Sequence, residues 1–202
     1  QRESEKKIDG INKTITDLQS ISKERDKSIS NVTNEMRVLQ KNREQANCGG
    51  GFVWRIDKWT EKMEQARANK YYYIDSESFY SHTNGYKRRL TVYPNGNGSG
   101  KGTHLSVWCC VMRGECDDIL PWPFKHDVTF ELIDQHTTQI HTQYKVKYEI
   151  DEEFTEVYQK PIDDMNDEGY GCPKFILLEE LSNNLSLIDN DQIFLRCRVK
   201  ID

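Results

Sequence analysis

"YKRRLTVYPNGNGSGKGTHLSVWCCVM", residues 86–112, decides the fold, because two strand-like segments flank a glycine-rich centre. Residues 86–94 and 104–112 are rich in β-branched and aromatic side chains and lack a helical period. The centre, residues 95–103, contains four glycines, a lysine and a threonine. This composition suggests either a phosphate-binding loop or a turn.

The glycine-rich centre matches neither phosphate-binding signature. The phosphate loop needs Gly-Lys followed by Ser or Thr, whereas Gly100 and Lys101 are followed by Gly102. The G-x-G-x-x-G spacing fails too, because Lys101 and Thr103 stand where the third glycine belongs. Two strands joined by such a turn predict a β-hairpin.

Further strand-like segments follow along the chain, at residues 52–56, 125–134, 141–150 and 192–201. One short helix is expected at residues 58–68. Many short strands separated by turn residues are typical of an antiparallel β-sandwich. We therefore expect a mainly β domain over residues 49–202.

Residues 1–48 form a separate part, since residues 1–47 have no proline, no aromatic side chain and one glycine. In heptads counted from Ile8, nine of the twelve a and d positions are apolar, which predicts a coiled coil rather than a lone solvated helix. Isoleucine at both a and d favours three or four strands, so we expect a parallel trimer, weakened at Ser22 and Arg25. The side chains expected to join the copies are Ile8, Ile11, Ile15, Leu18, Ile29, Val32, Met36 and Leu39.

Composition argues against nucleic-acid and membrane partners. The chain of 202 residues has a net charge of −5 with acids and bases interspersed, so it has no basic patch for nucleic acid or anionic lipid. The longest apolar run, Val107–Met112, is far too short to insert into a bilayer.

The spacing of the six cysteines and of the histidines indicates neither a metal site nor a catalytic site. None of the cysteines forms a C-x-x-C pair, and His136 and His141 lack the helical spacing of zinc enzymes. We therefore expect no cofactor, no metal and no catalytic site in this segment. Reduced, buried thiols favour the cytoplasm, whereas four Asn-x-Ser/Thr sequons leave a secreted protein open.

Seven strings in residues 52–200 carry a resemblance to a known family: "FVWRI", "FYSHTNGYKRRL", "YPNGNGSGKGTHLS", "LPWPFKHDVTFELIDQ", "YQKPIDDMN", "GYGCPKF" and "DNDQIFLRCRV". Together with the coiled coil before them, they resemble the C-terminal part of the TRAF (tumour necrosis factor receptor-associated factor) family, whose sandwich is also called MATH. The resemblance implies an eight-stranded antiparallel sandwich on a trimeric stalk, in a cytoplasmic signalling adaptor. Such adaptors bind short receptor or adaptor tails by strand addition. Family members usually carry RING and zinc-finger modules upstream, and no ligase chemistry is assigned to this segment.

The resemblance also implies a peptide-binding site. Where the family reads an acidic peptide residue with Arg and Tyr, this sequence has Thr91 and Tyr93, and where the family has an acid after the first hairpin glycine it has Asn97. Aromatic walls are expected at Trp108 and Tyr158, and a serine row is replaced by Thr155, Glu156 and Val157. The segment whose backbone pairs with the peptide corresponds to Tyr170, Gly171, Cys172 and Pro173. The matching peptide-binding positions are Thr91, Tyr93, Asn97, Gly98, Trp108, Thr155, Tyr158, Tyr170, Gly171 and Cys172.

These replacements suggest a changed ligand. Losing the arginine at Thr91 removes a charged hydrogen bond worth about 1.5–3 kcal/mol. Acidic residues in "EIDEEFTE", residues 149–156, would repel an acidic tail further. We therefore hypothesise a neutral or basic tail, with Arg89, on the same strand face as Thr91, as an alternative source of the missing cation.

Two other readings of the MATH resemblance stay open. One is an extracellular module as in meprin-type proteases, which the sequons favour. The other is the substrate-recruiting module of a ubiquitin ligase or deubiquitinase, which usually lacks so long a coiled coil directly before it.

Overall fold

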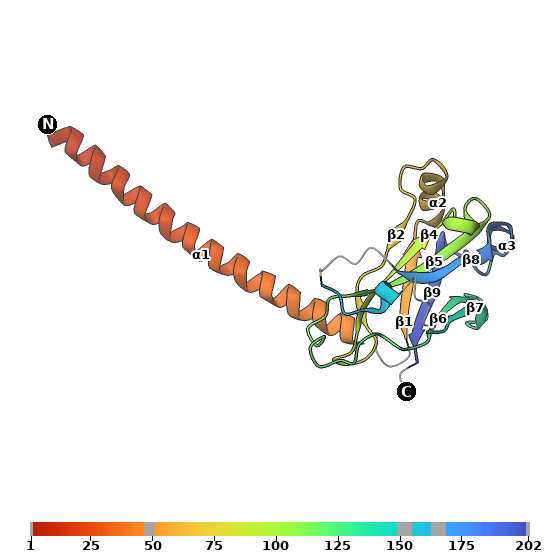
Figure 1. Ribbon diagram of the computed structural model, residues 1–202. Helices are drawn as coiled ribbons and strands as arrows, with labels where there is room; N and C mark the ends of the chain where they lie inside the picture. The colour runs from red at the N-terminus through yellow and green to blue at the C-terminus, as the bar shows by residue number, and fades with distance from the viewer. Residues whose placement is uncertain (1, 47–50, 149–154, 163–168, 201–202) are drawn as a thin grey trace. The chain divides into compact units, whose positions relative to one another are not determined.

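The computed structural model describes residues 2–46, 51–148, 155–162 and 169–200 (Figure 1). The chain divides into two compact units, Gln1–Arg43 and Glu44–Asp202. The predicted boundary between residues 48 and 49 lies outside the described residues. None of the described helices has the length and apolar character needed to cross a membrane.

The first unit is built from one helix, α1 (Arg2–Ala46), as the heptad pattern predicts. Its apolar stripe faces solvent in the single chain, and among the members whose side chains are described even the least exposed, Ile15, is 46% exposed. The other exposed members of the stripe are Ile11, Leu18, Ile29, Val32 and Met36. The side chains of Ile8 and Leu39 lie outside the described residues. Rows of exposed isoleucine and leucine in water favour association, so the trimer stays a prediction with support from this surface.

The second unit is the predicted antiparallel β-sandwich. One sheet has the order β1 (Phe52–Asp57), β9 (Gln192–Val199), β6 (Val128–Ile133) and β7 (Ile140–Val146). The other has the order β2 (Ile74–Asp75), β4 (Lys87–Tyr93), β5 (His104–Met112) and β8 (Tyr170–Leu177), with β3 (Phe79–Tyr80) also paired to β4. The described residues thus hold nine strands, two of which are only two residues long.

Short helices complete the sandwich unit: α2 (Trp59–Arg67), α3 (Leu178–Asn183) and the 3-10 turns η1 (Gly98–Gly100) and η2 (Thr155–Tyr158). The expected helix at residues 58–68 is confirmed as α2. Sequence analysis did not find β2, β3 and β8. The first two are too short for a periodic signal, and Gly171 and Pro173 interrupt the pattern of the third.

Alternation along the strands places the core between the two sheets. On β4, Arg88, Leu90 and Val92 are buried, whereas Arg89, Thr91 and Tyr93 on the opposite face are half-buried. Leu90 pairs with Cys109 on β5, and Phe130 on β6 contributes from the facing sheet. Each large apolar side chain buried in this way contributes about 1.5–3 kcal/mol.

The glycine-rich segment is the turn of the predicted β4–β5 hairpin. Gly96 has a φ of +76°, and a Cβ there would lie 2.2 Å from the carbonyl oxygen of Gly100. A Cβ on Gly100 would lie 1.8 Å from the carbonyl oxygen of Pro173, so only glycine allows the turn to pack against β8. The Ser106 hydroxyl secures this contact by donating to that oxygen at 2.6 Å and accepting from the Asn97 N–H at 2.8 Å.

Candidate functional site

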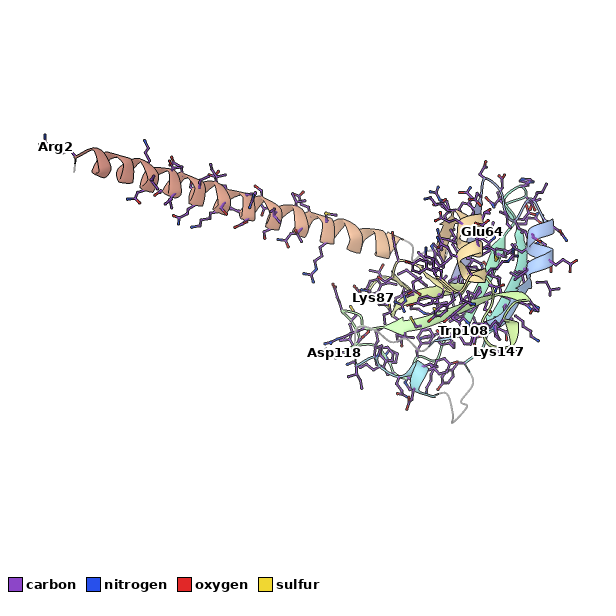
Figure 2. The ribbon with its side chains drawn as sticks, turned by 90° about the horizontal axis from the view of Figure 1, so that it is seen from above. Arg2, Glu64, Lys87, Trp108, Asp118 and Lys147 are labelled. Carbon is purple, nitrogen blue, oxygen red and sulfur yellow. The ribbon has the colours of Figure 1, made fainter. Side chains whose placement is uncertain are left out.

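A cavity of about 490 Å³ opens on the outer face of the sheet formed by β2, β4, β5 and β8. Strand pairing creates its floor, because Asp75, Thr91 and Trp108 are direct neighbours across β2, β4 and β5. Figure 2 labels Trp108 on β5 and Lys87 at the start of β4. The cavity is lined by Tyr72, Tyr73, Asp75, Arg89, Thr91, Tyr93, Asn97, Trp108, Cys109, Cys110, Val157 and Gly169.

The acidic side of the cavity comes from Asp75. One carboxylate oxygen, Oδ1, accepts a hydrogen bond from the Thr91 hydroxyl at 2.6 Å. The other, Oδ2, lies 3.4 Å from Nη1 of Arg89. Arg89 does share the face of Thr91 and Tyr93, as the strand period predicts, but its guanidinium lies against a carboxylate of its own chain.

Three tyrosines form an aromatic wall beside this ion pair. The ring of Tyr93 lies 6.4 Å from that of Tyr72 and 5.9 Å from that of Tyr73, measured between centroids. Burial is the main cause that raises the pKa of Tyr93, and the nearby Tyr72 and Asp75 add to it. The Tyr93 hydroxyl therefore stays protonated and can donate a hydrogen bond. The wall therefore combines apolar ring surface with neutral hydroxyl groups.

A second cavity of about 240 Å³ adjoins the first and shares Tyr72, Tyr93 and Asn97 with it. Asn69 and Lys101 bring polar groups to its lining. The two cavities make one groove, which we call the β4 groove, running from Gly169 past Tyr93 to Lys101.

One side of the β4 groove lies at the edge of the sheet. Among the described strands, β8 pairs only with β5, through Gly171 opposite Trp108 and Cys172 opposite Val107. An edge strand presents backbone N–H and C=O groups that can pair with an added strand. Gly169 and Gly171 place little side-chain bulk at this edge.

Comparison with known proteins then identifies the family. The family model described as "TRAF/meprin, MATH domain" matches residues 71–196. The chain belongs to the TRAF family. It is 32% identical to mouse TNF receptor-associated factor 1 over 94% of this chain and 44% of that protein. It is 31% identical to human TNF receptor-associated factor 2 over 96% of this chain and 37% of that protein. The chain therefore spans less than half the length of these relatives.

The TRAF fold is also found in a solved structure. Notothenia coriiceps TRAF5 superposes with a TM-score of 0.72 at 23% identity, covering 96% of this chain and 95% of the other. This match extends the shared fold to nearly the whole chain, and it says nothing of ligands. None of the matches named here is to a catalytic family.

The structure brings four of the residues expected from the TRAF resemblance together in the β4 groove: Thr91, Tyr93, Asn97 and Trp108. Gly98 lies in η1 and donates its N–H to the Asn97 side chain at 2.7 Å, so it acts on the groove through Asn97. Gly171 adjoins the groove through its pairing with Trp108.

Three other expected residues do not line the groove with their side chains, although the backbone of Tyr170 and Cys172, which is the part expected to pair with a peptide, lies on the edge strand β8. The side chains of Tyr158, Tyr170 and Cys172 are buried in the core, where the rings of Tyr158 and Tyr170 lie 4.9 Å apart. Thr155 begins η2, and its side chain lies outside the described residues, as do the acidic residues 149–153. Val157, the last position of the row expected to replace the family's serines, lines the groove, and so does Gly169.

Tyr72, Tyr73 and Asp75 are among the groove residues that sequence reasoning missed. The signal was present in "KYYYID", residues 70–75, where three consecutive tyrosines precede a strand. Solvent-facing tyrosines at a strand end are frequent in binding surfaces.

The described cysteines are free thiols, most of them buried, and His136 and His141 take part in hydrogen bonds. The five described cysteines are free, and Cys109, Cys110, Cys172 and Cys197 are buried. His141 bonds Glu180 at 2.9 Å, and the Asp134 carboxylate accepts from the His136 and Thr137 N–H groups. Within the described part of the chain, no cluster of three His, Cys, Asp or Glu side chains could hold a metal.

Proposed function

We propose that this chain is the tail-binding part of a trimeric, cytoplasmic signalling adaptor in the TNF receptor pathway. The observation that carries the proposal is the β4 groove beside the edge strand β8, in a chain that belongs to the TRAF family. Its relatives are named TNF receptor-associated factors. The segment itself acts by binding rather than by catalysis.

A short receptor or adaptor tail pairs with the outer edge of β8 as an extended strand. Main-chain hydrogen bonds give such a complex its affinity, and pockets for alternate side chains give it specificity. The rings of Tyr93 and Trp108 offer the tail apolar and hydrogen-bonding surface, and Tyr and Trp dominate the energy of many interfaces.

The helix α1 makes the adaptor respond to clustered receptors. Each groove is small, so a single tail binds weakly. Three grooves joined through the exposed apolar stripe of α1 gain about 10²–10⁴ in avidity towards clustered tails. The free, largely buried thiols of the sandwich suit the reducing cytoplasm.

An array of overlapping peptides from the cytoplasmic tails of TNF receptor family members tests the binding site. We expect some peptides to bind the wild type and to lose about tenfold or more with Trp108→Ala or Tyr93→Ala. The matched control is Tyr144→Ala, since Tyr144 is an exposed tyrosine on β7 of the other sheet. Equal loss with Tyr144→Ala, or peptides that bind both groove variants as well as wild type, would refute the site.

A further inference from the structure

The β4 groove contains an acidic residue of this chain, Asp75, beside the hydrogen-bond donors that a ligand carboxylate would use. Asp75 belongs to β2, and β-sheet pairing places it directly opposite Thr91. Its carboxylate accepts a hydrogen bond from the Thr91 hydroxyl at 2.6 Å and forms an ion pair with the Arg89 guanidinium at 3.4 Å. The three side chains come from two adjacent strands, so their arrangement is part of the sheet.

We propose that Asp75 acts as an internal substitute for an acidic ligand residue, so that this subsite accepts an uncharged side chain and rejects a carboxylate. The inference rests on the proposed tail-binding function, and it names the chemistry that the groove selects. Asp75, Arg89 and Thr91 are here specificity-determining residues.

Partial shielding from water strengthens the ion pair of the internal acid, although Asp75 as a whole residue is exposed. The side chains of Arg89 and Asp75 are 19% and 29% exposed, so water screens their interaction only in part. A ligand carboxylate would have to displace Asp75 from both donors or lie beside a second negative charge. Because Asp75 is held by its own strand, it competes without losing the freedom that a ligand loses on binding.

The lining also shows what the subsite favours. Asp75 and Arg89 balance in charge, and the side chains around them include Tyr72, Tyr73 and Tyr93. Neutral hydroxyl groups beside aromatic rings suit an amide or hydroxyl side chain of the tail, which can both donate and accept. A glutamine or serine therefore fits this position better than glutamate.

Three versions of one tail peptide that binds in the array test the selection, with Glu, Gln or Lys at the position that faces Asp75, Arg89 and Thr91. On the wild type we expect the Gln peptide to bind several-fold more tightly than the Glu peptide. Asp75→Ala removes the carboxylate that contacts Thr91 and Arg89, so the Glu peptide should gain about tenfold and become the preferred ligand. A wild type that prefers the Glu peptide, or an Asp75→Ala variant that keeps the wild-type order, would overturn the proposal.

Two further variants guard against indirect effects. Asp75→Asn keeps the shape of the side chain and removes its charge, and it should shift the preference in the same direction by a smaller factor. Asp57→Asn is the matched control, because Asp57 also pairs with an arginine, Arg55 at 2.9 Å, on β1 of the other sheet. It should leave the order of the three peptides unchanged, and a shift equal to that of Asp75→Asn would count against the proposal. Thermal unfolding of each variant confirms that it folds.

Acetate provides a measurement that does not depend on peptide binding. In NMR titrations, acetate should shift the Arg89 and Thr91 signals of Asp75→Ala at concentrations that leave the wild type unchanged. Equal shifts in both proteins would overturn the role of Asp75. If acetate distinguishes the two proteins but no peptide binds either, the tail-binding function fails while the internal acid stands.

Discussion

Arg88 donates a hydrogen bond from Nη2 to the sulfur of Cys109 at 2.9 Å, in a part of the core where neither side chain reaches solvent. The same nitrogen also donates to the Tyr170 hydroxyl, and the guanidinium lies 4.7 Å from the centre of the Phe124 ring. Burial raises the pKa of Cys109 well above its usual value, so its sulfur is a neutral thiol. The hydrogen bond from Arg88 anchors the Tyr170 side chain in the core.

Replacing Arg88 tests how much this buried cation lowers the free energy of unfolding. Among the described residues, Nε and Nη1 of Arg88 have no hydrogen-bond partner. Arg88→Met keeps most of the volume and removes the desolvated charge, so we expect unfolding free energy to rise by about 1 kcal/mol or more. Arg88→Ala instead leaves a cavity and should lower it by about 2–5 kcal/mol. Urea denaturation measures both, and a Met variant as unstable as the Ala variant would show that the cation itself stabilises the core.

The turn of the β4–β5 hairpin gives a second prediction. Gly100→Ala should lower the unfolding free energy by about 2–3 kcal/mol, because the new Cβ meets the Pro173 carbonyl oxygen and the backbone must shift. Gly102 lies in the same turn with a φ of +76° and open space around it. Gly102→Asn should therefore cost less than about 1 kcal/mol, since asparagine tolerates this conformation. Similar losses in both variants, measured by thermal unfolding, would contradict the close packing of Gly100.

The sandwich and one face of the groove could be predicted because they depend on local pattern. Alternation along residues 86–94 placed Arg89, Thr91 and Tyr93 on one face, and the structure confirms this. The glycine-rich turn and the helix α1 also follow from local composition. Short strands with a strong period leave few alternatives.

The rest of the groove depends on pairing between distant segments. Asp75 meets Thr91 only because a two-residue strand pairs in one register, and no period marks so short a strand. The register of the β5–β8 pairing shifts between Leu105 and Val107 of β5. Alternation in the sequence of β8 therefore does not show which of its side chains face inward along the whole strand. The side chains of Tyr170 and Cys172 are buried in the core, while the resemblance assigns the peptide contact of this segment to its backbone, so that part of the expectation stays a prediction.

The Asp134 carboxylate predicts a pH dependence of stability. Its hydrogen bond from Ser186, with a further bond from the Thr137 N–H, lowers its pKa from 3.8 to about 2. A depressed pKa in the folded state means that the carboxylate stabilises the fold above its unfolded pKa, and that this contribution is lost as pH falls towards 2. Asp134→Asn should therefore lower Tm near neutral pH, and the difference from wild type should shrink between about pH 4 and 2. A difference that stays constant over that range would show that the charge of Asp134 is not involved.

The apolar stripe of α1 predicts that oligomerisation and tail binding can be separated. Ile15→Lys combined with Ile29→Lys places charges at two a positions of the stripe and leaves the helix free of proline. We expect this variant to sediment as a monomer, to bind a single tail peptide with unchanged affinity, and to lose about 10²–10⁴ in affinity for a trimeric tail fusion. Asp17→Lys with Asn31→Lys adds the same residues two positions along, on the polar face, and should remain trimeric. Wild-type protein that sediments as a monomer at micromolar concentration, or equal losses in the single-peptide and trimer assays, would contradict the proposed role of α1.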